Sequence, residues 1–235
     1  SAASDVYKRQ VPDTVETIEF KAFQFASNLK TIDLGRVDTI SGRAFWYCIS
    51  LTSLYIRATV DAIAYNSFTG CDSLKEFTVD PNNREFTDID GILFTKDLET
   101  IVKYPEGMTQ TYYSIPTSVK VIGDGAFWSN EYLRDVVIPD GVETIGMDAF
   151  LLVSLGTVSI PASVKEIGRM AFRYCDLTSV NIHGSNVAIG SEAFSFNSDL
   201  SSIYIHGSLG KLDSEAFSNI NTQKVTVYYD SSLDL

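Results

Sequence analysis

Residues 142–161 read VETIGMDAFLLVSLGTVSIP, and the rest of the chain repeats this phrase with variations. Neighbouring copies lie 22 or 23 residues apart, except for one interval of 59 residues. A period of about 20–29 residues with leucine-like positions in every copy is the signature of a leucine-rich-repeat solenoid. The copies are marked by eight phenylalanines, most of them preceded by alanine: Phe23, Phe45, Phe68, Phe127, Phe150, Phe172, Phe194 and Phe217.

Each copy contains two apolar segments. The pattern L-x-x-V-x-I, as in Leu155, Val158 and Ile160, ends with two apolar residues that point to the same side of a short strand. The pattern V-x-x-I, as in Val142 and Ile145, supplies a second inward-facing edge. One copy cannot bury both of these segments, so we expect the copies to stack with their strands in parallel, about 4.8 Å apart.

The sequence therefore predicts a leucine-rich-repeat solenoid, a β-rich fold with one long parallel sheet on one face. We expect mostly loops and short helical turns on the other face, and one β-hairpin insertion. The eight phenylalanine rings should be buried in a single column along the coils. Truncating one of them should cost about 3–5 kcal/mol, because the void cannot collapse.

The interval of 59 residues indicates one normal copy followed by an enlarged one, at about residues 80–116. In it, two apolar runs at residues 92–94 and 98–102 flank the polar Thr95, Lys96 and Asp97. Such a pattern predicts a β-hairpin, which should project from one coil or cap its edge.

The two ends of the chain do not fit the repeat. Residues 1–10 read SAASDVYKRQ, and the part DVYKRQ matches an in-frame translation of a common sequencing adapter. We therefore expect residues 1–10 to be a non-native segment, residues 11–230 to form a single solenoid, and residues 231–235 to be a polar tail.

Composition and motifs exclude several classes of function. The net charge is −12, with 30 acidic and 18 basic residues, and no run of basic residues suggests nucleic acid or an anionic membrane as a partner. No stretch approaches the 18 or so apolar residues of a membrane span. The chain has no G-x-S-x-G, Walker or H-E-x-x-H motif, so we expect no enzyme activity and no cofactor. We expect a monomer.

The three cysteines occupy one position of the repeat, three residues after a phenylalanine. Cys48, Cys71 and Cys175 alternate there with Ala26, Asn130, Val153, Asn197 and Ile220. A position that accepts these types is a packing site, so buried free thiols are the favoured interpretation. A disulfide between Cys48 and Cys71, which lie on neighbouring coils, is the alternative.

The outward side of the strands is the most informative surface, and its carboxy-terminal end combines aromatic and polar side chains. Aromatic residues with polar tips are over-represented at binding surfaces. The alternative is that tyrosine and threonine merely favour exposed strands. The candidate binding residues are Asn181, His183, Tyr204, His206, Lys224 and Tyr228 at this end, with Tyr55 and Arg57 at outward positions nearer the amino terminus.

Two features resemble metal sites without completing one. His183 and His206 should lie side by side on adjacent coils, but the matching positions next to them are Pro161 and Tyr228, so no third ligand is in line. Residues 88–91, DIDG, contain part of a calcium-loop pattern, which Phe86 interrupts, and we interpret them as a turn. We expect no metal site.

The phrase V-x-x-I-G-x-x-A-F-x-x-C-x-x-L-x-x-V-x-I-P resembles the BspA-like leucine-rich repeats of bacterial surface proteins. The long copy DPNNREFTDIDGILFTKDLETIVKYP, residues 80–105, carries the same resemblance. It covers residues 11–228 approximately. The resemblance implies an extracellular or cell-surface protein that binds host or microbial partners, but it implies no particular ligand and no shared functional residue.

Three hypotheses about function follow. The first is a binding module that recognises a protein or glycan through the strand face of the solenoid. The second is a passive spacer that presents other domains of a longer surface protein. The third is an enzyme whose catalytic part lies outside this sequence.

Overall fold

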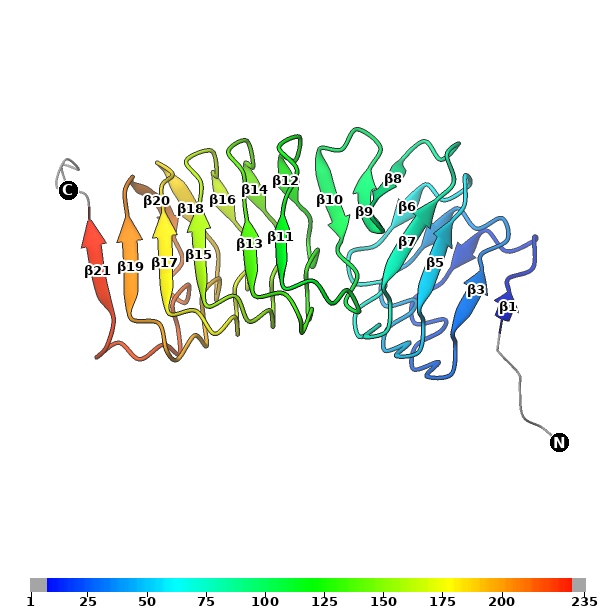
Figure 1. Cartoon of the computed structure of the whole chain (residues 1–235), viewed down its shortest axis with the longest axis horizontal. Helices are drawn as coiled ribbons and strands as arrows, with labels where there is room; N and C mark the ends of the chain where they lie inside the picture. The colour runs from blue at the N-terminus through cyan, green and yellow to red at the C-terminus, as the bar shows by residue number, and fades with distance from the viewer. Residues whose placement is uncertain (1–7, 230–235) are drawn as a thin grey trace. The chain divides into compact units, whose positions relative to one another are not determined.

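The computed structural model describes residues 8–229, and these contain strands and turns but no helix. The chain forms two compact units, residues 1–108 and residues 109–235. Both are β-solenoids with parallel coils, as the repeat predicts (Figure 1). Residues 1–7 and the expected polar tail lie outside the described residues.

Most coils contribute a long strand from the pattern L-x-x-V-x-I and a short strand from the pattern V-x-x-I. In the first unit the long strands are β1 (Lys8–Gln10), β3 (Thr31–Asp33), β5 (Ser53–Ile56) and β7 (Glu76–Val79), and the short strands are β2 (Thr17–Ile18), β4 (Thr39–Ile40) and β6 (Ala62–Ile63). In the second unit the long strands are β11 (Tyr112–Ser114), β13 (Asp135–Val137), β15 (Thr157–Ile160), β17 (Ser179–Ile182), β19 (Ser202–Ile205) and β21 (Thr226–Tyr229). Its short strands are β12 (Val121–Ile122), β14 (Thr144–Ile145), β16 (Glu166–Ile167), β18 (Val187–Ile189) and β20 (Leu209–Leu212).

Both sets of strands pair in parallel with the neighbouring coils. Long strands pair as β1–β3, β5–β7, β11–β13 and β15–β17–β19–β21. Short strands pair as β2–β4–β6 and β12–β14–β16–β18–β20. The short strands thus form a second parallel sheet, where the sequence had indicated only an inward-facing edge. The expected short helical turns are non-helical turns in residues 8–229.

The first strand, β1, comes from the segment that fits no copy of the repeat. Its backbone pairs with β3, with Lys8 opposite Thr31 and Gln10 opposite Asp33. Three of the ten residues that we expected to be non-native therefore continue the sheet of the first coils.

The phenylalanine rings stack along the inside of each unit. In the second unit, neighbouring rings from Phe127 to Phe217 lie 4.7, 5.1, 5.3 and 5.0 Å apart, with planes within 11° of parallel. In the first unit, Phe23, Phe45 and Phe68 stack at 5.2 and 5.6 Å. Six of the eight rings are buried, whereas Phe23 and Phe217, the first and last of the eight, are half-buried.

The position three residues after a repeat phenylalanine makes side-chain hydrogen bonds where it holds cysteine or asparagine. The thiols of Cys48 and Cys71 donate to the carbonyls of Phe23 and Phe45 on the preceding coil, at 3.1 and 3.2 Å. All three cysteines are free and buried, as the sequence predicts, and the alternative disulfide is not formed. The thiols therefore add a bond between coils to carbonyls that also accept from the main-chain amides of Ala26 and Cys48.

The turns between short and long strands use left-handed backbone at two positions, two residues before and two residues after the repeat phenylalanine. Around Phe45 these are Arg43 and Tyr47, both with φ of 57°. Around Phe194 they are Glu192 and Phe196, with φ of 57° and 59°. Because the left-handed region is unfavourable for bulky residues, these turns hold strained backbone in most coils.

The insertion is a three-stranded antiparallel sheet made of β8 (Phe86–Ile89), β9 (Ile92–Thr95) and β10 (Thr100–Lys103). The predicted hairpin is its β9–β10 half. The DIDG segment ends β8 and turns into β9 through Asp90 and Gly91, with φ of 51° and 81°. An Asp-Gly pair with both φ values positive matches the preferred two-residue hairpin turn.

The insertion caps the edge of β7, one of the two placements expected for it. The amide of Phe77 donates to the carbonyl of Gly91 at 2.8 Å, and the amide of Val79 donates to the Asp88 carboxylate at 2.7 Å. These two bonds cover the free edge of β7 within the first unit. A buried ion pair at the end of the insertion joins Lys103 to Glu106 at 2.9 Å.

Candidate binding surfaces

The predicted strand-face residues of the second unit form a continuous row across β17, β19 and β21. The strand register places Asn181 beside Tyr204 and Tyr204 beside Tyr228. The two tyrosine rings stack at 4.6 Å with planes 8° apart. Tyr204 is half-buried, and Tyr228 is 47% exposed. The row therefore has aromatic area and hydroxyl groups held in one arrangement by the sheet.

The two histidines lie just past the ends of β17 and β19 and form a second pair. The rings of His183 and His206 stack at 4.5 Å with planes 4° apart, and both are exposed. Their backbone amides donate to the carbonyls of Ile160 and Ile182, at 3.0 and 2.8 Å, which fixes their place beside the strands. The expected adjacency of the histidines is confirmed.

The last coil differs from the alignment that the sequence suggested. Thr226 pairs with Ser202 and Tyr228 pairs with Tyr204, so the row is displaced by two residues from the expected one. The reason is a longer final turn, which ends in the bond from the Lys224 amide to the Asn221 carbonyl at 2.9 Å. Lys224 consequently precedes β21 and does not join the row, and the position opposite His206 falls outside the described residues.

The other two predicted binding residues belong to the first unit and are engaged in contacts of their own. The Tyr55 hydroxyl donates to the Asp80 carboxylate at 2.9 Å, and this bond raises the pKa of Tyr55. The Arg57 guanidinium donates to the Asp33 carboxylate from Nε at 2.8 Å. Tyr55 thus lies on β5 and Arg57 directly after its end, and the polar groups of both are paired to neighbouring coils.

The turns of the second unit carry a further cluster that the sequence analysis did not select. The Tyr174 and Phe196 rings stack at 4.5 Å, and the Arg173 guanidinium lies 5.2 and 4.7 Å from their centres. This guanidinium also pairs with Glu192 and contacts the Met170 sulphur at 3.5 Å. The arginine is therefore held by an acid, a thioether and two rings.

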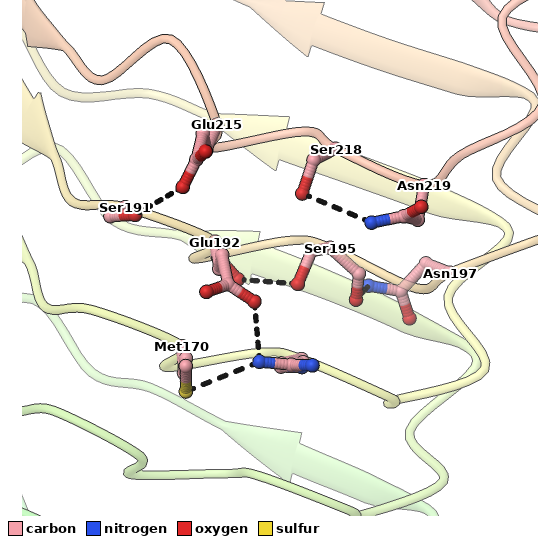
Figure 2. Close-up of polar contacts among 9 residues, drawn as sticks. Met170, Ser191, Glu192, Ser195, Asn197, Glu215, Ser218 and Asn219 are labelled. Carbon is pink, nitrogen blue, oxygen red and sulfur yellow. Dashed lines mark hydrogen bonds and ion pairs between the residues drawn. The ribbon is translucent and has the colours of Figure 1, made fainter.

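Polar contacts link the neighbouring turns in the same region. Figure 2 shows Ser191 directed toward Glu215, with a hydroxyl-to-carboxylate distance of 3.3 Å. The Ser195 hydroxyl donates to the Glu192 carbonyl at 3.0 Å. Two buried atoms lack a hydrogen-bond partner here, Asp148 Oδ1 and Arg173 Nε. Burial raises the pKa of Asp148, although the Arg169 charge counteracts this.

The turns of the first unit present a larger aromatic cluster. Phe25 is 62% exposed and Tyr47 is 44% exposed, and their rings lie 5.7 Å apart. Trp46 contacts both rings and is half-buried. The Arg43 guanidinium lies 4.6 Å from the centre of the Trp46 ring.

A signal for these turn clusters was present in the sequence. The residue two positions after the repeat phenylalanine is large and apolar in five coils, as Phe25, Tyr47, Leu152, Tyr174 and Phe196. Nothing in the repeat pattern places this residue in the core. Comparing the columns of the repeat for exposed aromatic side chains, rather than the strands alone, would have found it.

Two negative observations apply to residues 8–229. No helix there is long and apolar enough to span a bilayer. No group of three or more histidine, cysteine, aspartate or glutamate side chains in the same range could hold a metal ion.

Comparison with known proteins identifies the repeat. The sequence profile of the BspA type leucine-rich repeat region matches residues 3–115 and 120–233 in six copies. No curated protein sequence gives a significant match.

Several solved structures share the fold. A leucine-rich repeat protein from Eubacterium ventriosum is 19% identical, with a TM-score of 0.75 over 95% of this chain and 72% of that one. A leucine-rich cell surface protein from Faecalibacterium prausnitzii is 26% identical, with a TM-score of 0.75 over 96% of this chain and 60% of that one. The pneumococcal vaccine antigen PcpA is 23% identical, with a TM-score of 0.73 over 96% of this chain and 63% of that one. The chain thus spans less than two thirds of the last two proteins.

The repeat phrase, the parallel coils and the matching profile agree over most of the sequence. The chain belongs to the BspA-type leucine-rich repeat family.

Proposed function

We propose that this chain is a binding module of a bacterial surface protein, and that it recognises a protein partner through the strand face of its second unit. The proposed contact centres on Tyr204 and His206, with Tyr228, His183 and Asn181 around them. A cell-surface location is supported by the likeness to the Faecalibacterium cell surface protein.

The observation that carries the proposal is the pair of ring stacks on neighbouring rows of one rigid sheet. Tyr204 stacks on Tyr228 at 4.6 Å, and His183 stacks on His206 at 4.5 Å. Binding of a partner costs the module little side-chain conformational entropy, because the sheet and the stacking already order these side chains. Tyrosine is also enriched among the residues that dominate binding energy.

A protein is favoured over a glycan as the partner. Sugars bind aromatic residues by lying flat on an open ring face. In each of these stacked pairs, one face of each ring is covered by the other ring. The hydroxyl and imidazole N–H groups remain available as hydrogen-bonding groups for a polypeptide surface.

The test is binding of the purified chain to a panel of immobilised host surface proteins and glycans, measured by surface plasmon resonance. Tyr204→Ala and His206→Ala should weaken binding of the partner by about 1–2 kcal/mol or more. Thr157→Ala and Ser159→Ala are matched controls, because both side chains are exposed on β15 of the same sheet.

Equal binding by all four variants would show that another surface makes the contact. Binding of glycans alone, with the same sensitivity to Tyr204→Ala, would replace the protein by a sugar. If the parent chain binds nothing in the panel, the spacer hypothesis becomes the better one.

A further inference from the structure

The turn face of the first unit exposes more aromatic surface than its coils require. We define this face by residues 20–25, 42–47 and 65–70, which join the short strands to the long strands. Phe20 is 58% exposed, Phe25 is 62% exposed, and Tyr65 is 40% exposed. The rings of Phe25, Trp46 and Tyr47 contact one another and form an apolar patch open to water, and such patches mark interaction sites on soluble proteins.

The backbone at the centre of this patch is unfavourable for the residues that it carries. Phe25 and Tyr47 have φ of 60° and 57°. The equivalent residue of the next coil is Gly70, with φ of 78°, and in the second unit one equivalent is Asn219, with φ of 56°. Glycine and asparagine satisfy the same turn, so the turn itself does not require an aromatic ring.

Two cations accompany the rings. The Lys21 ammonium lies 5.1 Å from the centre of the Phe20 ring, and the Arg43 guanidinium lies 4.6 Å from the centre of the Trp46 ring. Within residues 8–229, neither cation forms an ion pair, whereas Arg173 on the turns of the second unit pairs with Glu192. The acids that flank the face in sequence are Glu19 and Asp72.

The positions of the two cations determine which chemical groups of a partner can bind there. A guanidinium stacked on an aromatic ring keeps its N–H groups in its own plane, where they can bind a carboxylate through two parallel hydrogen bonds. Arg43 lies over one face of Trp46 and Lys21 over one face of Phe20, which leaves less open ring surface for a flat sugar. The face is therefore suited to carboxylates that stand next to an apolar side chain.

We propose that the turn face of the first unit binds an acidic peptide segment of a partner protein. Carboxylates of the segment pair with Lys21 and Arg43, and an apolar side chain packs on Phe25 and Tyr47. A cavity of about 520 Å³ borders Phe25 and is lined by Arg9, Phe23 and residues 26–29, which gives a large apolar side chain room beside the rings.

The experiment is selection of a phage-displayed library of random dodecapeptides on the immobilised chain. Selected peptides should place aspartate or glutamate next to leucine, phenylalanine or tryptophan. Synthetic copies should bind the chain in solution, with Kd rising as the salt concentration rises, because exposed charges are screened. Tyr47→Asn and Arg43→Asn should each raise Kd about tenfold or more, as the loss of a central contact does.

Tyr174→Asn is the matched control. Tyr174 occupies the same turn position, with φ of 55° and 41% exposure, but on the second unit. Because asparagine is tolerated in the left-handed region, the thermal unfolding midpoint of all three variants should stay close to that of the parent. A binding loss without loss of fold therefore separates recognition from stability.

Four outcomes would overturn the proposal. These are enrichment of no peptides, enrichment of neutral or basic peptides, equal binding of the selected peptides by Tyr47→Asn and the parent, and greater sensitivity to Tyr174→Asn than to Tyr47→Asn. Binding of sialylated or sulfated glycans in place of peptides, or dimerisation of the chain that Tyr47→Asn abolishes, would also replace it.

Discussion

The thiol of Cys175 donates a hydrogen bond to the main-chain carbonyl of Phe150, 3.0 Å away on the preceding coil. On the next coil, the side-chain amide of Asn197 donates to the main-chain carbonyl of Phe172 at 2.9 Å. Cysteine and asparagine therefore perform the same function at this position. Each links its coil to the preceding one by donating to a phenylalanine carbonyl, and the Phe150 carbonyl also accepts from the Val153 main-chain amide at 3.1 Å.

Replacing Asn197 by alanine should destabilise the chain by about 3 kcal/mol, because buried partners lose their hydrogen bonds. The side chain donates to the carbonyls of Phe172 and Phe194, and its oxygen accepts from the amides of Cys175 and Leu177, all at 3.0 Å or less. Urea denaturation followed by circular dichroism measures the change. Asn197→Cys should recover part of it, since a thiol can donate to Phe172. Equal losses for the two variants would contradict the donor role.

The phenylalanine column predicts a graded cost of truncation. Phe150 is fully buried between Phe127 and Phe172, so Phe150→Ala should cost about 3–5 kcal/mol. Phe217 is half-buried and stacks with Phe194 alone among the repeat phenylalanines, so Phe217→Ala should cost about 1–3 kcal/mol. Equilibrium unfolding in urea would compare them, and equal costs would show that stacking on both sides adds nothing.

Asp148→Gly should stabilise the chain by about 1 kcal/mol, because it removes a buried oxygen without a partner. The backbone already has φ of 56°, and the preceding coil has Gly125 at this position with φ of 62°. Asp124→Gly is the control. The Asp124 carboxylate accepts a hydrogen bond from the Met147 amide at 2.7 Å, so its removal should not stabilise the chain.

The gain from Asp148→Gly should depend on pH. Burial raises the pKa of Asp148 above its unfolded value, so the ionised carboxylate opposes folding at neutral pH. The advantage of the variant should therefore be largest near pH 7 and should shrink below about pH 4, where the carboxyl is protonated in both states. Thermal unfolding at the two pH values measures it, and an advantage that grows on acidification would reverse the sign argued here.

The three thiols should be unreactive in the folded chain. Burial raises the pKa of Cys48 to about 11 and the pKa of Cys71 well above its ordinary value, so both remain neutral at pH 8. A thiol reagent such as Ellman's reagent attacks the thiolate and needs access, which the fully buried side chains deny. We expect labelling only in denaturant, and rapid labelling of the folded chain would show that the coils open locally.

The repeat period was sufficient to predict the parallel coils and the phenylalanine column, because both depend on apolar spacing, whereas it left open whether the insertion projects from a coil or caps its edge. Spacing could not predict the third strand of the insertion, which depends on the Asp90-Gly91 turn closing on β9. Nor could it predict the row that pairs Tyr228 with Tyr204, because the length of the final turn decides that register. The exposed rings of Phe25 and Tyr47 lie in turns, where the repeat pattern constrains the backbone but leaves the side chain open.

The parallel register of the coils also fixes the spacing at which a partner meets equivalent side chains. Equivalent side chains recur once per coil, and the ring stacks on the surface of the second unit measure 4.5, 4.5 and 4.6 Å between centres. An α-helix presents one face every 5.4 Å, and an extended strand presents one face about every 6.8 Å. A helix laid along a row therefore drifts by about 1 Å per coil and a strand by about 2 Å. A partner that contacts several coils at once must repeat close to this period, whereas a partner that contacts a single coil need not.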